Sequence, residues 1–146
     1  MKWILTITAF ILMASSAAIA ANSGTPANWT EATPESMAEA GFDLMLKGEY
    51  IKMAETWFDD FDSSQMDPDK LELAKRQYVT QMPMVGKCIR YELAARKEYG
   101  KSVVKLTYIV FAEKTPLFFT FLYCKPDQNW TALNISFSDK WADLDK

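Results

Sequence analysis

The spacing of hydrophobic side chains changes once along this chain. Between Pro34 and Pro83 they recur every three or four positions, and between Cys88 and Phe137 every second position. The first spacing is typical of amphipathic helices and the second of half-buried strands. The pattern therefore predicts helices followed by strands, which is an α+β order.

Three helices are predicted in the first segment. The first begins at Thr33-Pro34-Glu35, where a hydroxyl N-cap, a proline and an acid favour helix initiation, and it ends at Gly48. The third begins at Asp67-Pro68 and runs to Pro83. The second begins near Glu49 and has the most regular apolar stripe, formed by Tyr50, Met53, Ala54, Trp57, Phe58 and Phe61.

Four strands are predicted in the second segment, and their short connections indicate an antiparallel meander. Strict alternation in the first strand places Ile89, Tyr91 and Leu93 on one face and Cys88, Arg90 and Glu92 on the other. The predicted hairpins pair Tyr99 with Ser102 and Glu113 with Pro116. The expected strands are Cys88–Arg96, Val103–Glu113, Leu117–Lys125 and Trp130–Phe137.

The first twenty residues have the three parts of a secretory signal peptide. Lys2 supplies the positive end, Trp3 to Met13 form an apolar core, and Ala18-Ile19-Ala20 form a small-residue cleavage site. The apolar core is about half the length that a membrane-spanning helix needs. We therefore expect cleavage after Ala20 and an extracytoplasmic, periplasmic or secreted soluble protein with no membrane span. Residues 21–33 are expected to be a flexible leader, residues 34–139 one domain, and residues 140–146 a short tail.

Composition excludes several classes of chemistry. Removing Lys2 from 16 basic and 19 acidic residues leaves 15 and 19, a formal charge of −4 without the basic stripe that nucleic acids require. The chain has no histidine, so Ser-His-Asp, Cys-His and imidazole–zinc sites are ruled out. Asp59, Asp60 and Asp62 lack the turn and distal acid of a calcium loop, and we interpret them as a solvated helix end. No cofactor or metal is expected.

The order of elements resembles the nuclear transport factor 2-like superfamily over about residues 34–139. The resemblance rests on Gly86-x-x-x-Arg90-x-Glu92, Leu106-Thr107-Tyr108-Ile109-Val110, Pro116-Leu117-Phe118-Phe119-x-Phe121 and the stretch from Trp130 to Phe137. These segments are similar to the small, exported branch of that superfamily. The resemblance implies three helices packed on a curved, cone-like sheet around an apolar pocket. It implies no catalytic residue here, because no early hairpin separates the helices and histidine is absent.

Six side chains are candidate ligand contacts between helices and sheet. Arg90 could bind an anionic group at the mouth of the pocket, or it could form an exposed ion pair with Glu92. The aromatic candidates could line a cavity, or they could be ordinary helix-on-sheet core. The hydroxyl of Tyr108 lies on an otherwise apolar strand face. The candidates are Trp57, Phe61, Tyr78, Arg90, Tyr108 and Phe119.

Two arguments about Cys88 and Cys124 conflict. An exported chain with an even number of cysteines favours a disulfide. The predicted register instead places Cys124 level with Arg96, eight residues from Cys88, or about 26 Å at roughly 3.3 Å per residue. A disulfide needs Cα atoms within about 7 Å. The sequence therefore does not decide between a Cys88–Cys124 disulfide and two free cysteines.

The sequence thus predicts a non-catalytic exported domain that binds a small apolar or amphipathic ligand. The alternative is a protein-interaction module that uses the outer sheet face, as a homodimer or as an inhibitor or immunity-type partner of an extracytoplasmic protein. Its apolar patch would comprise Val103, Ile109, Phe111, Phe118 and Leu122.

Overall fold

The structure is a computed structural model that describes residues 32–61 and 66–144. The predicted signal peptide and the leader up to residue 31 lie outside the described residues. Within them, α-helices α1 (Pro34–Leu46), α2 (Tyr50–Asp59) and α3 (Pro68–Gln81) precede the sheet, which confirms the predicted α+β order. None of these helices has the length and apolar character needed to cross a bilayer.

The predicted helix signals are present as hydrogen bonds. The Thr33 hydroxyl accepts from the Ser36 amide at 3.1 Å, and the Ser36 hydroxyl accepts from the Thr33 amide at 2.9 Å. This reciprocal capping box fixes the start of α1. The Asp67 carboxylate accepts from the Asp69 amide at 3.0 Å at the start of α3. Gly48 follows α1 with φ at 75°, a conformation that suits glycine and turns the chain into α2.

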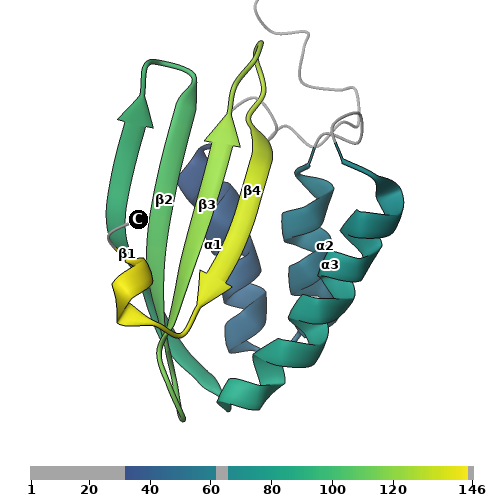
Figure 1. Ribbon diagram of the computed structural model, residues 1–146, viewed down its shortest axis with the longest axis vertical. Helices are drawn as coiled ribbons and strands as arrows, with labels where there is room; N and C mark the ends of the chain where they lie inside the picture. Colours follow the sequence, from purple (N-terminus) through teal and green to yellow (C-terminus); the bar gives the residue numbers. More distant parts are fainter. Residues whose placement is uncertain (1–31, 62–65, 145–146) are drawn as a thin grey trace, which may run out of the picture.

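Four antiparallel strands follow in the order β1-β2-β3-β4 (Figure 1). The short 3-10 helix η2 (Met82–Val85) connects α3 to the sheet. A second 3-10 helix, η3 (Trp141–Asp143), lies within the expected C-terminal tail. The strands are β1 (Cys88–Tyr99), β2 (Val103–Ala112), β3 (Leu117–Cys124) and β4 (Thr131–Ser138).

The strand register differs from the predicted one. Tyr99 pairs with Val103 rather than with Ser102, a shift of one residue. Val103 in turn pairs with Cys124, where the predicted register placed Lys105. The second hairpin therefore differs by two residues. Turn residues alone did not determine the pairing. The shift of one residue changes which side chains lie opposite each other on a face, whereas the shift of two residues keeps the faces and changes only the partners.

Strict alternation in β1 was also wrong. The register shifts between Cys88 and Arg90, and again between Leu93 and Ala95. Each irregularity adds an unpaired residue and reverses which side chains face the helices. Cys88 is consequently buried, whereas Ile89, which was expected on the face opposite to it, is 61% exposed. Arg96, opposite the fully buried Leu106, lies on the helix side beyond the second irregularity.

Cys88 and Cys124 are both free thiols at opposite ends of the sheet. Cys124 is level with Val103, and Val103 is level with Tyr99, which lies eleven residues along β1 from Cys88. That separation is roughly 36 Å at about 3.3 Å per residue. The geometry therefore favours free cysteines over an intramolecular bridge.

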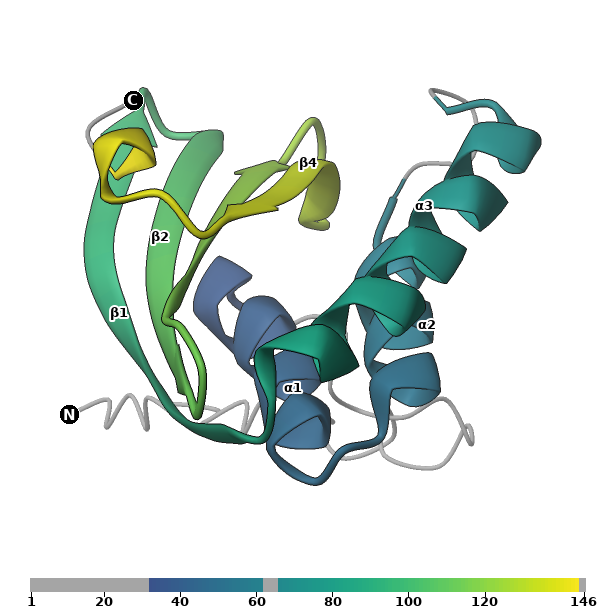
Figure 2. The same ribbon diagram turned by 60° about the horizontal axis from the view of Figure 1, so that its bottom comes forward.

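One face of the sheet packs against the helices (Figure 2). Helices α1 and α2 contribute Phe42 and Trp57 to the centre of the core, where their rings lie 5.0 Å apart. Helix α3 packs on α2 and buries Tyr78 against the β4 side of the core. The strands contribute alternate side chains to the same core, namely Leu106, Tyr108, Val110, Leu117, Phe119, Phe121 and Tyr123.

Three acidic residues on α1 connect the helix to the first two strands. Glu35, Glu39 and Asp43 are spaced by four residues, which places them along one side of the helix. Glu35 accepts from Arg96 Nε at 2.5 Å, Glu39 from the Tyr108 hydroxyl at 3.1 Å, and Asp43 from the Tyr91 hydroxyl at 2.9 Å. This row fixes α1 along the sheet.

The helical layer also covers the free edge of β4. The Ala132 amide donates to the Asp60 carbonyl at 2.8 Å, and Phe61 forms a parallel bridge with Ala132. The Tyr78 hydroxyl donates to the Ile135 carbonyl at 3.0 Å. Edge groups that would otherwise be open to another strand are therefore satisfied within the chain.

Candidate functional site

Four of the six predicted ligand contacts lie in the closed core. Trp57, Tyr108 and Phe119 are 0% exposed and Tyr78 is 6% exposed. The Trp57 ring lies 5.4 Å from the Phe119 ring, and its Nε1 donates to the Ala38 carbonyl at 2.8 Å. The four are neighbours, as expected for the lining of a pocket, but other side chains enclose them. A ligand would reach them only if the helices moved away from the sheet.

The Tyr108 hydroxyl, predicted to be a polar contact for a ligand, is already hydrogen-bonded to Glu39. Burial, reinforced by the negative charge of Glu39, raises the pKa of Tyr108 above its usual range. The phenol therefore stays protonated as a hydrogen-bond donor at neutral pH. Its hydrogen bond ties β2 to α1.

Phe61 and Arg90 are not enclosed with these four residues. Phe61 is half-buried at the end of α2 and stacks on Phe58 at 5.5 Å. Arg90 lies on the opposite, outer face of the sheet, with its guanidinium 3.8 Å above the Phe111 ring. Its NH1 donates to Glu92 at 2.6 Å in an exposed ion pair. The structure thus places Arg90 apart from the core aromatic residues.

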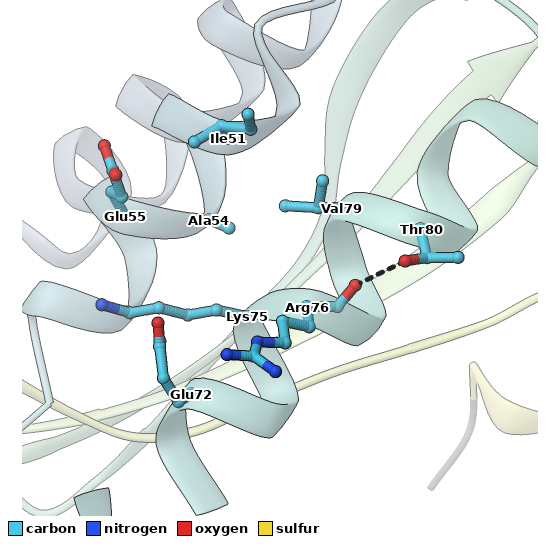
Figure 3. A pocket seen from close by; sticks show the side chains of 8 residues that line it. All are labelled: Ile51, Ala54, Glu55, Glu72, Lys75, Arg76, Val79 and Thr80. Atoms are coloured by element: carbon cyan, nitrogen blue, oxygen red, sulfur yellow. Dashed lines mark hydrogen bonds between the residues drawn. The ribbon is translucent and has the colours of Figure 1, made fainter. Parts of the chain in front are cut away.

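A groove of about 400 Å³ runs between α2 and α3 (Figure 3). Its apolar surface comes from Ile51, Ala54 and Val79. Most of the remaining lining consists of two acidic and two basic side chains, whose formal charges cancel. They are Glu55, Glu72, Lys75 and Arg76. Lys75 pairs with Asp59 at 3.4 Å, and the Thr80 hydroxyl is turned back onto the Arg76 carbonyl at 2.8 Å. The side chains of Glu55, Glu72 and Arg76 make no ion pair within the described residues, but their mixed charges favour neither an anionic nor a cationic ligand.

The outer face of the sheet carries two adjoining hollows of about 410 and 360 Å³. Lys105 and Thr120 line both of them. The first hollow is otherwise mainly apolar, with Val103, Leu122 and Tyr99 around it. The second is more polar, with hydroxyl and carboxyl groups from Ser136, Ser138 and Asp143 beside the rings of Phe118 and Phe137. The surface therefore becomes more polar across Lys105.

Lys105 is half-buried and makes no ion pair within residues 32–61 and 66–144. Its neighbour across the strands is Lys97, another cation, whose ammonium lies 5.0 Å from the Tyr99 ring. Like charges opposite each other on a sheet destabilise it, so these two lysines create a local positive potential without an internal counter-charge. The Asp143 carboxylate lines the second hollow with Lys105, so an anionic group that relieves the repulsion would lie on the side of Lys105 nearer to Lys97.

The predicted apolar patch on this face is partly covered. The ring of Trp141 lies 4.7 Å from that of Phe118, which is 3% exposed. The helix η3 therefore folds back onto the sheet rather than extending from it as a free tail. The other four patch residues are half-buried: Val103, Ile109, Phe111 and Leu122.

Asp60 has the most perturbed carboxyl group of the acidic stretch. Burial, and secondarily the charge of Asp59, raises its pKa to about 7. Within the described part of the chain, no group of three or more acidic, cysteine or histidine side chains is placed to hold a metal ion. Asp62, the third acid of the predicted helix end, lies outside the described residues.

No family model, curated protein or solved structure matches this chain. The resemblance to the nuclear transport factor 2-like superfamily therefore stays a prediction. The sequence assigned Val103, Phe118 and Leu122 to an outer-face patch for a protein partner, but it did not predict a ligand site around Lys105. The alternation that assigns Val103, Lys105 and Thr107 to one strand face was visible, but the pairing of Lys105 with Lys97 depends on the register.

Proposed function

We propose that the mature chain is an exported, non-catalytic binding domain that takes a small amphipathic anion on the outer face of its sheet. The observation that carries this proposal is Lys105, a half-buried cation without an ion-pair partner in the described residues, placed where an apolar hollow meets a more polar one. Export is inferred from the first twenty residues. Kinship with the nuclear transport factor 2-like superfamily, including its cone-like sheet, belongs to the same proposal.

The dimensions and chemistry of the surface favour a small ligand. Ligand sites typically have volumes of about 300–1,000 Å³ and combine apolar walls with a few polar groups that fix orientation. An anionic head would accept hydrogen bonds from Lys105 and Thr120. An apolar body would lie over Val103 and Leu122, away from the Asp143 carboxylate.

Decanoate is a suitable probe, with decanol as the uncharged control of the same length. Titration into the isotope-labelled mature chain should shift the amide signals of Val103 and Leu122 with decanoate. Because a hydrogen bond to a charged group contributes more than a neutral one, Lys105→Met should weaken decanoate binding by about tenfold or more. Lys105→Arg should retain it, and Lys101→Met, in the exposed β1–β2 turn, should change nothing.

Equal binding of decanoate and decanol, or shifts confined to Ile51 and Val79 in the α2–α3 groove, would contradict the proposal. The alternative prediction, a protein-interaction module on the outer face, stays a prediction. Trp141 favours it, because this tryptophan is 62% exposed beside the apolar patch and tryptophan is a frequent anchor of protein interfaces.

A further inference from the structure

The rest of the chain covers one edge of the sheet, at β4, and leaves the other edge, at β1, without a paired strand in the described residues. The β4 edge receives hydrogen bonds from Tyr78 and contacts from the end of α2. Strand β1 is the longest strand, with twelve residues, and along its outward edge no strand pairs with it in the described residues. Alternate residues of an antiparallel edge strand direct their amide and carbonyl groups outward, where another strand can pair with them.

The β1 edge also exposes apolar side chains. Leu93 is 42% exposed and Tyr99 is 46% exposed. The strand also carries charged residues of both signs, with Arg90, Glu92 and Lys97 on the outer face. Such charges prevent indiscriminate pairing of an open edge, and they permit pairing where opposite charges meet.

The irregularity between Leu93 and Ala95 restricts how two copies of β1 could pair. Before it, even-numbered residues lie on the outer face, and after it, odd-numbered residues do. In a symmetric antiparallel pair, outer-face residues of one copy must oppose outer-face residues of the other. Residues that precede the irregularity in one copy lie opposite residues that follow it in the other copy. Even-numbered outer-face residues of the first part must therefore pair with odd-numbered outer-face residues of the second part.

One register meets this condition with complementary charges. It places Glu92 opposite Lys97 of the second copy, and the symmetry repeats that pair at the other end. It also places Arg90 opposite the ring of Tyr99 and Leu93 opposite the stem of Arg96. A shift of two residues in one direction would oppose Arg90 to Lys97, and the reverse shift would oppose Glu92 to Tyr99, so both lose the charge match.

The charge of Lys97 favours an ion pair with a carboxylate from another chain. It faces Lys105 across β1 and β2, and it makes no ion pair within the described residues. Glu92 of a second copy would supply the missing negative charge and would reduce the repulsion between the two lysines. Lys105 would remain in the hollows of the outer face.

We infer that two copies of this chain pair through their β1 edges, antiparallel and centred between Ala94 and Ala95, with Glu92 of each copy opposite Lys97 of the other. The two sheets then form one continuous sheet of eight strands around a two-fold axis. This dimer does not depend on the proposed ligand, because the ion pair that sets its register joins Glu92 and Lys97, which line neither hollow, although Tyr99 lines the first hollow as well.

A charge exchange tests both the dimer and its register. Sedimentation or light scattering of the mature chain should show a concentration-dependent dimer. Glu92→Lys and Lys97→Glu should each raise the dimer dissociation constant about tenfold or more, because each places like charges opposite each other twice. The double variant Glu92→Lys/Lys97→Glu should restore the dimer, since the pair is again complementary. Glu72→Lys on the exposed side of α3 is the control for an equal change of charge.

Circular dichroism of each variant verifies that the monomers are folded, which is expected because Glu92 and Lys97 are exposed. A wild-type chain that stays monomeric at high concentration would overturn the inference. So would a dimer that neither single variant weakens. Failure of the double variant to recover, with both single variants monomeric, would overturn the proposed register.

Discussion

Gly41 of α1 lies directly against the indole of Trp57 of α2. A methyl group added at Gly41 would lie 2.1 Å from Trp57 Nε1 and 2.2 Å from Cε2, closer than atoms can approach. The same indole nitrogen donates to the Ala38 carbonyl one turn earlier. The absence of a side chain at Gly41 thus lets the two helices approach and buries the largest side chain of the core.

Gly41→Ala should therefore destabilise the protein, although alanine is the better helix former. We expect a loss of about 2–3 kcal/mol in the free energy of unfolding, measured by urea titration, because overpacking forces the indole from its place. Ala40→Gly, at the exposed neighbouring position, should cost only about 1 kcal/mol from helix propensity. A Gly41→Ala variant as stable as the wild type would show that α1 and α2 are not packed this closely.

Two buried tyrosines should respond oppositely to loss of their hydroxyl groups. The Tyr78 hydroxyl donates to the Ile135 carbonyl, so Tyr78→Phe should cost about 1–2 kcal/mol. The Tyr123 hydroxyl is buried without a hydrogen-bond partner in the described residues. Tyr123→Phe should therefore be neutral or stabilise by up to about 1 kcal/mol. Thermal and urea denaturation of the two variants compare them directly, and a destabilising Tyr123→Phe would reveal a partner for that hydroxyl.

Asp60 should make the protein less stable as the pH rises. Its pKa is about 7 in the folded chain against an ordinary value of 3.8, so between these values the folded chain holds a proton that the unfolded chain has released. The free energy of unfolding should then fall from about pH 4 to about pH 7 and stay lower above.

Asp60→Asn should remove this slope and stabilise the protein at pH 8 by about 1–2 kcal/mol, a value discounted because the side chain is only partly buried. Urea titrations at several pH values measure it. Asp127→Asn, in the exposed turn before β4, is the matched control and should leave the slope unchanged. If the free energy of unfolding of Asp60→Asn depends on pH as steeply as that of the wild type, another group causes the pH dependence.

The signal peptide predicted from the first twenty residues can be tested at the mature amino terminus. Intact-mass measurement of the protein recovered from the extracytoplasmic fraction of a secreting host should give a chain beginning at Ala21. Ala20→Arg should block cleavage, because the site requires small residues. Recovery of the full-length wild-type chain in the cytoplasm would refute the signal peptide.

Much of the local structure could be predicted because its causes are local. The caps at Thr33 and Asp67 act within three residues, and the stripe from Tyr50 to Phe58 follows from helical spacing. The predicted strand boundaries agree with β2, β3 and β4 to within one residue at each end. The extension of β1 from Arg96 to Tyr99 was missed, because the charged side chains of Lys97 and Glu98 interrupt the apolar alternation on which the prediction was based.

The sequence by itself determined the order of helices and strands, the positions of their caps and the absence of imidazole chemistry. Only the tertiary structure decided the register, the irregularities in β1 and the pairing of Lys97 with Lys105. It also decided that the aromatic side chains near Trp57 are enclosed, whereas the hollows lie on the opposite face. The reason is physical: hydrophobic periodicity reports the face on which a residue lies, but not the partner that it meets across the sheet.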